Sequence, residues 1–121
     1  MIFSQKEFDL RIKKVKDSMS KLGIDILIST DPSNMNYLTG YDGWSFYVPQ
    51  GVIVSADDNQ PFWFGRKQDS KGARITTFLS FILPLVISLA TPAAAVVLLP
   101  LLSNITDTRK SAKKFFCIAL N

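Results

Sequence analysis

The sequence has no histidine, and it has only one cysteine and one glutamate. Histidine is the commonest side-chain general base and a frequent metal ligand, so its absence excludes Ser-His-Asp and Cys-His catalysis and most zinc chemistry. The single Cys117 excludes an internal disulfide and is typical of a reducing compartment. No apolar h-region follows the first methionine, so the N-terminus does not match a secretory signal. We therefore assign no catalytic residue and no metal ligand in this chain.

The chain is also short and carries little net charge. Its 121 residues suffice for one small domain, and a net charge of +4 does not by itself indicate nucleic acid or an anionic membrane as a partner. Six basic residues lie between Lys6 and Lys21, and they leave a weak nucleic-acid-binding face as one alternative. Three of them follow an acidic residue by four positions, at Glu7, Asp9 and Asp17, which is typical of a solvated helix face. The prediction is that the chain has no nucleic-acid partner.

An amphipathic helix is predicted from Ser4 to Leu22. Ser4 and Glu7 match the S-x-x-E capping box, and Phe3 and Phe8 have the positions of a hydrophobic staple. The glycine that follows Leu22 supplies a C-terminal stop. Apolar residues recur every three or four positions and so share one face of the helix: Phe8, Ile12, Val15, Met19 and Leu22.

The segments after this helix predict a layered α/β domain. Residues 24–29 are apolar and β-branched apart from one aspartate, which is typical of a buried strand. Residues 51–55 and 62–64 are predicted to form a hairpin, because a turn-forming stretch separates them. A further helix is expected from Arg66 to about Leu79. This order of elements favours a sheet covered by helices.

An aromatic-rich stretch between these elements is the best candidate for a functional segment. Asp31 and Pro32 match the first positions of a short helix, and Gly40 matches its end. Four aromatic residues follow within seven positions, and they offer large, rigid contact surfaces with polar ends: Tyr41, Trp44, Phe46 and Tyr47.

This stretch resembles a known family. From Asp31 to Tyr41 the sequence reads Asp-Pro-x-Asn-x-x-Tyr-Leu-Thr-Gly-Tyr, which is similar to the signature of the N-terminal domain of the creatinase and Xaa-Pro aminopeptidase family. Residues 42–48 and 63–69 resemble the ectoine hydrolase branch of that family. The similarity covers about residues 5–79. It implies a mixed sheet flanked by helices, with a ribonuclease H-like topology that is incomplete here.

The resemblance implies a non-catalytic role. The family's catalytic residues belong to a separate C-terminal domain that often binds divalent metal, and because nothing here matches that domain we expect no cofactor in this chain. N-terminal domains of relatives contact other subunits and help to line a neighbouring active site. We therefore expect a homo-oligomer or the catalytic domain of the parent enzyme as the partner, and the cytoplasm as the location.

Five residues are candidates for the interface or for substrate binding. Four are the aromatic residues Tyr41, Trp44, Phe46 and Tyr47, and the fifth is Arg66, which could meet a carboxylate substrate such as ectoine. The alternative is that the aromatic residues pack on their own sheet and that Arg66 only begins a surface helix.

The composition changes near the end of the resemblance. No charged residue occurs in residues 75–106, and residues 78–103 are almost wholly apolar but include three prolines. This run could span a membrane, since about 20 apolar residues suffice, form a buried core element, or arise from out-of-frame sequence. The predicted domains are a partial creatinase-type domain at residues 1–79 and an apolar, then basic, tail at residues 80–121. We expect a truncated or frame-shifted product, and the alternative is a membrane-anchored interaction module.

These observations predict that the isolated chain hydrolyses neither ectoine nor Xaa-Pro peptides, with or without divalent metals. The reason is that it has no histidine and a single glutamate, which is expected to cap a helix. The measurement is product release by the purified chain and by its Glu7→Gln variant. Metal-stimulated turnover that survives Glu7→Gln would reveal a different catalytic site, whereas turnover lost in that variant would make Glu7 catalytic.

Overall fold

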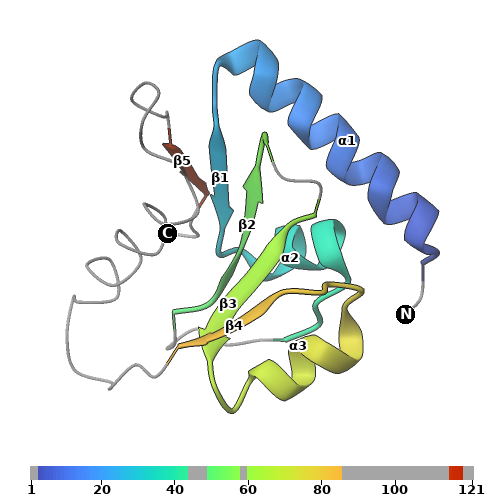
Figure 1. Cartoon of the computed structure of the whole chain (residues 1–121), viewed down its shortest axis with the longest axis vertical. Coiled ribbons are helices and arrows are strands. Elements are labelled where there is room, and N and C mark those ends of the chain that lie inside the picture. The colour runs from blue at the N-terminus through green and yellow to red at the C-terminus, as the bar shows by residue number, and fades with distance from the viewer. Residues whose placement is uncertain (1–2, 44–48, 58–59, 86–114, 119–121) are drawn as a thin grey trace.

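The computed structural model describes residues 3–43, 49–57, 60–85 and 115–118 (Figure 1). Helices and strands alternate along most of this part of the chain. In chain order the elements are α1 (Gln5–Leu22), β1 (Ile26–Ser29), α2 (Pro32–Thr39), β2 (Gly51–Ser55), β3 (Phe62–Arg66), α3 (Ser70–Thr76), β4 (Ile82–Leu85) and β5 (Phe115–Ile118).

The five strands form one mixed sheet in the order β4-β3-β2-β1-β5. β2 is antiparallel to both of its neighbours, with Leu27 of β1 opposite Val54 and Trp63 of β3 opposite Val52. β4 pairs with β3 in parallel, and β5 pairs with β1 in parallel at the other edge. In Figure 1, β5 accordingly lies beside β1 and away from β4. The predicted α/β fold with a mixed sheet and flanking helices is confirmed.

α1 begins where the capping pattern predicts. The Ser4 hydroxyl accepts a hydrogen bond from the backbone N–H of Glu7 at 3.3 Å, and the rings of Phe3 and Phe8 meet edge to face with centroids 6.1 Å apart. The Glu7 carboxylate accepts a hydrogen bond from Nε of Arg11 at 3.0 Å, and the Arg11 guanidinium lies 4.2 Å from the centre of the Phe3 ring. These contacts fix the first two turns of the helix.

The three helices pack on one face of the sheet. Burying large apolar side chains there contributes about 1.5–3 kcal/mol for each, relative to leaving them exposed. The cluster on this helix-covered face combines helix and strand residues: Met19, Met35, Leu38 and Ala73 from the helices and Leu27, Val52, Val54, Trp63 and Ile82 from the strands.

A second, smaller cluster occupies the opposite face. Strand residues alternate between the two faces, so the neighbours of the helix-facing residues point the other way. Four are buried there, Ile26, Ile53, Phe62 and Phe64, and Ile28 and Leu83 pack against them while partly exposed. No residue of a described helix belongs to this cluster. We call these six residues the second face.

The last predicted helix is shorter than expected. α3 begins at Ser70, because Arg66 is still part of β3 and pairs with Leu85 of β4. Asp69 precedes the helix, and Thr77 ends it at an extended backbone conformation. The prediction of a helix beginning at Arg66 is therefore wrong, since it took no account of the parallel partner strand.

Two strands come from the segment assigned to a tail. β4 (Ile82–Leu85) and β5 (Phe115–Ile118) both lie beyond residue 79, and both belong to the sheet of the N-terminal part. β4 also falls inside the run from 78 to 103 for which a membrane span was considered, whereas residues 86–103 lie outside the described residues. Across residues 3–43, 49–57, 60–85 and 115–118, no helix has the length and apolar character needed to cross a bilayer.

The α1 cap predicts a measurable cost of its removal. Ser4→Ala should lower the free energy of unfolding by about 1 kcal/mol, because the N–H of Glu7 loses its side-chain acceptor. The matched control is Ser18→Ala in the same helix, where the hydroxyl donates only to the exposed carbonyl of Lys14 and where the change should stay within about 0.5 kcal/mol. Urea denaturation measures both, and equal midpoints for the two variants would contradict a structural role for the cap.

Candidate functional site

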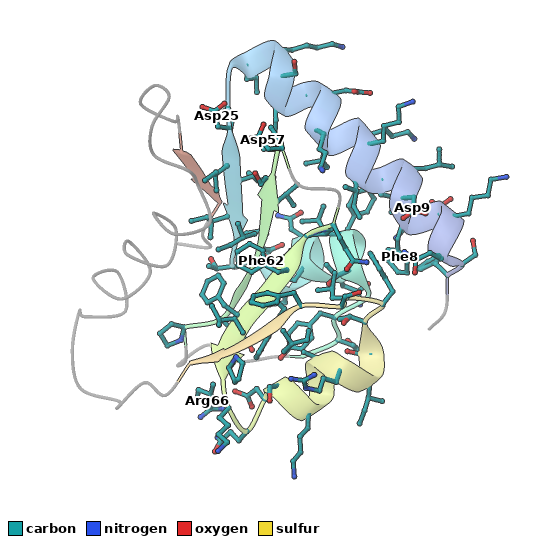
Figure 2. The ribbon with its side chains drawn as sticks, in the orientation of Figure 1. Phe8, Asp9, Asp25, Asp57, Phe62 and Arg66 are labelled. Atoms are coloured by element: carbon teal, nitrogen blue, oxygen red, sulfur yellow. The ribbon has the colours of Figure 1, made fainter. Side chains whose placement is uncertain are left out.

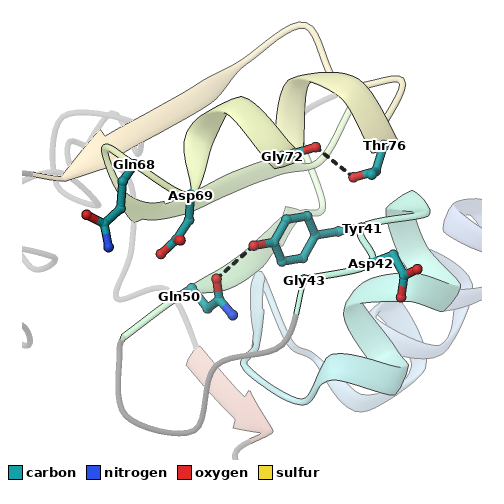
Figure 3. Close-up of a pocket in the computed structure, with 8 residues that line it drawn as sticks. All are labelled: Tyr41, Asp42, Gly43, Gln50, Gln68, Asp69, Gly72 and Thr76. Atoms are coloured by element: carbon teal, nitrogen blue, oxygen red, sulfur yellow. Dashed lines mark hydrogen bonds between the residues drawn. The ribbon is translucent and has the colours of Figure 1, made fainter.

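A small polar hollow opens beside α3. It has a volume of about 240 Å³ and lies between this helix, the turn that follows α2 and the start of β2. Figure 3 shows the side chains around it, with the Tyr41 ring between the turn and β2. The hollow is lined by Tyr41, Asp42, Gly43, Gln50, Gln68, Asp69, Gly72 and Thr76.

Tyr41 is held in the wall of this hollow by ring packing and by hydrogen bonds. Gly40, in a left-handed conformation with φ of 77°, ends α2 and turns the chain inward. The Tyr41 side chain is 4% exposed, and its ring centre lies 5.4 Å from that of Trp63. Its hydroxyl donates a hydrogen bond to Oε1 of Gln50 at 2.9 Å, and its backbone N–H donates to the Thr39 hydroxyl at 3.2 Å.

The surroundings of Tyr41 raise the pKa of its phenol above the usual value of 10.0. Burial is the largest cause, because it disfavours the charged phenolate, and the negative charge of Asp69 adds to it. The Trp63 indole and the Arg66 guanidinium act in the opposite direction. Tyr41 therefore stays protonated at neutral pH and acts as a hydrogen-bond donor.

Arg66 does not line the hollow, but it is hydrogen-bonded to Asp69, which does. Its Nε donates a hydrogen bond to Oδ2 of Asp69 at 2.7 Å, and its Nη2 donates one to Oδ1 at 3.3 Å. The guanidinium and the carboxylate therefore form a bidentate pair. Both side chains remain partly exposed, and Arg66 lies at the end of β3 in Figure 2. The pair links β3 to the start of α3 and offsets the charge of an acidic residue that lines the hollow.

The other three predicted site residues, Trp44, Phe46 and Tyr47, lie outside the described residues. Gln50 and Asp69 were missed as site residues. An isolated glutamine carries no signal in the sequence, and Asp69 appeared only as the last residue of the stretch 63–69 that resembles the ectoine hydrolase branch. Position 43 has a clear structural reason to be glycine, because a Cβ there would overlap the ring and hydroxyl of Tyr41. The turn can therefore follow the ring closely only with glycine at that position.

A second hollow adjoins the first. It has a volume of about 280 Å³ and shares Asp42 and Thr76 with the polar one, but its other walls are mainly apolar. Ile75, 80% exposed, and Phe3, 43% exposed, lie at this end, and Arg11 covers the Phe3 ring. The two hollows together offer hydrogen-bonding groups at one end and apolar contact at the other.

Within the part of the chain that the structure describes, no group of three or more aspartate, glutamate, cysteine or histidine side chains comes together. The groups at the hollows can bind and orient a partner through hydrogen bonds and packing.

Comparison with known proteins identifies the family. The model of the creatinase/prolidase N-terminal domain matches residues 11–85, which includes every described helix and strand from the second turn of α1 to β4. The chain belongs to this family.

Similar proteins agree with the assignment. The ectoine hydrolase of Halomonas elongata is 47% identical over 77 residues, which is 64% of this chain and 19% of that protein. A solved Xaa-Pro aminopeptidase structure from Streptococcus pyogenes is 17% identical with a TM-score of 0.63 and covers 95% of this chain and 94% of that one. The N-terminal domain of the cytoplasmic peptidase PepQ from Mycobacterium tuberculosis is 19% identical with a TM-score of 0.56, over 64% and 56% of the two chains.

This creatinase/prolidase N-terminal domain thus spans about a fifth of the length of the curated relatives that it matches. The motif from Asp31 to Tyr41 has a structural basis in the domain. The Asp31 carboxylate caps α2 by accepting a hydrogen bond from the N–H of Asn34 at 2.9 Å. At the other end of α2, the left-handed turn at Gly40 directs the chain so that Tyr41 lies at the hollow. The motif therefore places Tyr41 in the wall of the candidate site.

The bond between Tyr41 and Gln50 predicts a loss of stability and a change in its pH dependence. Tyr41→Phe should lower the free energy of unfolding by about 0.5–1.5 kcal/mol at pH 7, because Gln50 loses a buried donor. The raised pKa means that the folded state binds this proton more tightly than the unfolded state, so the resulting stabilisation is complete below pH 10 and is lost as the pH rises through the raised pKa.

Tyr37→Phe is the matched control, because Tyr37 is 43% exposed and its ring can keep its contact with Arg11. Urea unfolding of both variants and of the original chain, repeated from pH 7 to pH 11, measures the effect. Tyr41→Phe should unfold more easily at pH 7 and lose less stability above pH 10 than Tyr37→Phe. The same pH dependence in both variants would contradict the role assigned to Tyr41.

Proposed function

We propose that this chain is a non-catalytic N-terminal domain of a C–N hydrolase resembling ectoine hydrolase and the Xaa-Pro peptidases. Its role is to contact a neighbouring subunit or the catalytic domain and to complete a substrate pocket there. The observation that carries the proposal is the polar hollow, to whose wall the family motif contributes Tyr41 and which presents the Tyr41–Gln50 pair and Asp69. The 47% identity to ectoine hydrolase supports this branch of the family.

The proposed partner surface is the pair of adjoining hollows along α3. The polar one can accept hydrogen bonds at Asp42 and Asp69 and contact a polar group at Gln68, while the apolar one has an exposed isoleucine and an aromatic wall. A loop from a catalytic domain with one apolar and one polar or basic side chain would match these two ends. Trp44, Phe46, Tyr47 and Arg66 remain proposed members of the interface or the substrate pocket.

Metal and substrate chemistry are assigned to the partner. We propose that any divalent metal of the parent enzyme is bound by its catalytic domain and that this chain contributes contacts to substrate or protein only. The similarity to a cytoplasmic peptidase supports the cytoplasm as its location.

A chimeric enzyme tests the proposed role. The matching segment of Halomonas elongata ectoine hydrolase is replaced by the corresponding residues of this chain, and two substitutions are made at Gly72. Gly72 lies on α3, lines the polar hollow and has open space around the position of a Cβ, so the helix can accept a side chain there. Gly72→Ala leaves the hollow open, whereas Gly72→Gln fills it.

Both variants replace glycine by a good helix former, so both should gain about 0.5–1 kcal/mol of stability. The chimera and its Ala variant should assemble and hydrolyse ectoine, and the Gln variant should lose at least about tenfold in kcat/KM or dissociate into subunits, because a partner contact worth about 1.4 kcal/mol corresponds to a factor of ten. Equal activity and assembly of the two Gly72 variants would contradict the contact role of the hollow.

A further inference from the structure

A buried hydrogen-bond donor next to the polar hollow has no acceptor. The Trp63 side chain is fully buried, and its Nε1–H has no hydrogen-bond partner in the part of the chain that the structure describes. An unpaired buried donor is unfavourable, and native proteins normally supply a protein group, a water or a ligand for it. The unpaired indole therefore indicates that an acceptor is missing at this place.

The unpaired N–H lies beside two residues that line the hollow. The Trp63 indole lowers the pKa of the Tyr41 phenol, an effect that acts only at short range, although the two groups form no hydrogen bond. A Cβ at Gly65 would meet both the Cζ2–Cη2 edge of the indole, which adjoins Nε1, and Cβ of Gln50. The Nε1 side of the ring thus faces Tyr41 and Gln50, which both line the polar hollow.

The bond between Tyr41 and Gln50 keeps the nearest acceptor turned away from the indole. The phenol donates its only proton to Oε1 of Gln50 at 2.9 Å, so this bond fixes the direction of the amide oxygen. If an acceptor in the hollow took the phenol proton instead, Oε1 of Gln50 could turn and accept from Trp63. One additional acceptor in the hollow is therefore enough to pair all the donors of this wall.

The facing side of the hollow supplies acceptors. Figure 3 shows the Asp69 carboxylate pointing toward the Tyr41–Gln50 pair, and its charge raises the pKa of the Tyr41 phenol. Arg66 donates two hydrogen bonds to this carboxylate, which has about four acceptor positions, so it can accept more. The exposed Asp42 adds a second carboxylate where the two hollows meet. An entering group thus needs an acceptor for Tyr41 and a donor for Asp69.

A carboxamide is a small group that has both. Its oxygen accepts hydrogen bonds and its nitrogen donates them, on neighbouring atoms of one plane. A carboxylate of the same shape has no donor and is repelled by Asp42 and Asp69, whereas an amidinium has no acceptor for Tyr41. The apolar hollow of about 280 Å³ begins at Asp42 and Thr76 of the polar one, so it offers room for an apolar substituent on the amide.

We propose that the two hollows bind a small molecule with a primary carboxamide and a short apolar substituent. The carbonyl oxygen accepts from the Tyr41 phenol, the amide N–H donates to Asp69, and Gln50 turns to accept from Trp63. The substituent enters the apolar hollow. This inference deepens the proposed function by naming a ligand class, and it rests on that function for the assignment of the polar hollow to a substrate pocket.

Nuclear magnetic resonance titration of the full chain tests the proposal, with the Trp63 indole N–H as the reporter. The chain has two tryptophans, so a nitrogen-15 spectrum has two indole signals, and Trp44→Phe identifies the signal of Trp63. Acetamide, acetate and acetamidinium have the same shape and differ in their donors, acceptors and charge. The fourth probe, 3-methylbutanamide, adds an apolar substituent to the amide.

Acetamide should move the Trp63 indole proton signal downfield, because the N–H gains an acceptor. Acetate and acetamidinium should leave this signal in place. Binding of 3-methylbutanamide should be at least about threefold tighter than that of acetamide, because the apolar hollow removes its substituent from water. A larger response to acetate or acetamidinium, no response to either amide, or equal affinity for the two amides would overturn the proposal.

Tyr41→Phe and Tyr37→Phe are the matched variants. Without the phenol, Oε1 of Gln50 is free to accept from Trp63, so the indole signal of Tyr41→Phe should already lie downfield in the free chain. Acetamide should then no longer move it. Tyr37 is 43% exposed and does not line the polar hollow, so Tyr37→Phe should respond as the original chain does. The same spectra for both variants would contradict the proposal.

Two substitutions at Gly72 cover the case in which Tyr41→Phe does not fold. Gly72→Leu fills the polar hollow without adding a hydrogen-bonding group, so acetamide should bind at least about tenfold more weakly, whereas Gly72→Ala should keep its affinity. Equal affinities would overturn the proposal.

The titration and the chimera can fail separately. An indole signal that no amide moves, in a chain whose Gly72→Gln chimera is impaired, would overturn this ligand and leave the proposed function in place. Amide binding by a chain whose Gly72→Gln chimera is fully active would support the ligand and overturn its role in the parent enzyme.

Discussion

The burial of Trp63 is the constraint on which the domain depends. The side chain is fully buried, on a strand that lies between β2 and β4, and its register places it opposite Val52 and Ile82. A Cβ at Gly65, two positions further along β3, would overlap the Trp63 ring, so this strand needs a glycine there. Because three strands and the turn after α2 all meet this one ring, a change in its position would move the sheet and the candidate site together.

The candidate site depends on this packing through Tyr41. The Tyr41 ring rests against Trp63 and its hydroxyl bonds to Gln50, so the turn after α2 is tied to both β2 and β3. The absence of a side chain at Gly43 lets the backbone follow the ring. Core packing therefore fixes the position of Tyr41 in the wall of the polar hollow, and a preorganised wall of this kind suits the proposed contact with a catalytic domain.

Much of the local structure could be predicted from the sequence, because its causes are local. The cap at Ser4, the cap at Asp31 and the left-handed turn at Gly40 each depend on residues within one helical turn, and all three are present. The hairpin of β2 and β3 followed from two apolar runs around a turn. The family resemblance, carried by the motif from Asp31 to Tyr41, was confirmed by the match over residues 11–85.

The sequence by itself thus determined α1, α2, the hairpin and the family, since periodicity and capping act between near neighbours. Only the tertiary structure decided the limits of α3, because β4 extends the pairing of β3 to Arg66. It also decided that Ile82–Leu85 and Phe115–Ile118 join the sheet at opposite edges. The Tyr41–Gln50 and Arg66–Asp69 pairs meet at one hollow for the same reason. The pairing of β3 with β4, the pairing of β1 with β5 and the meeting of Tyr41 with Asp69 at one hollow join residues far apart in the chain, and no local pattern specifies such partners.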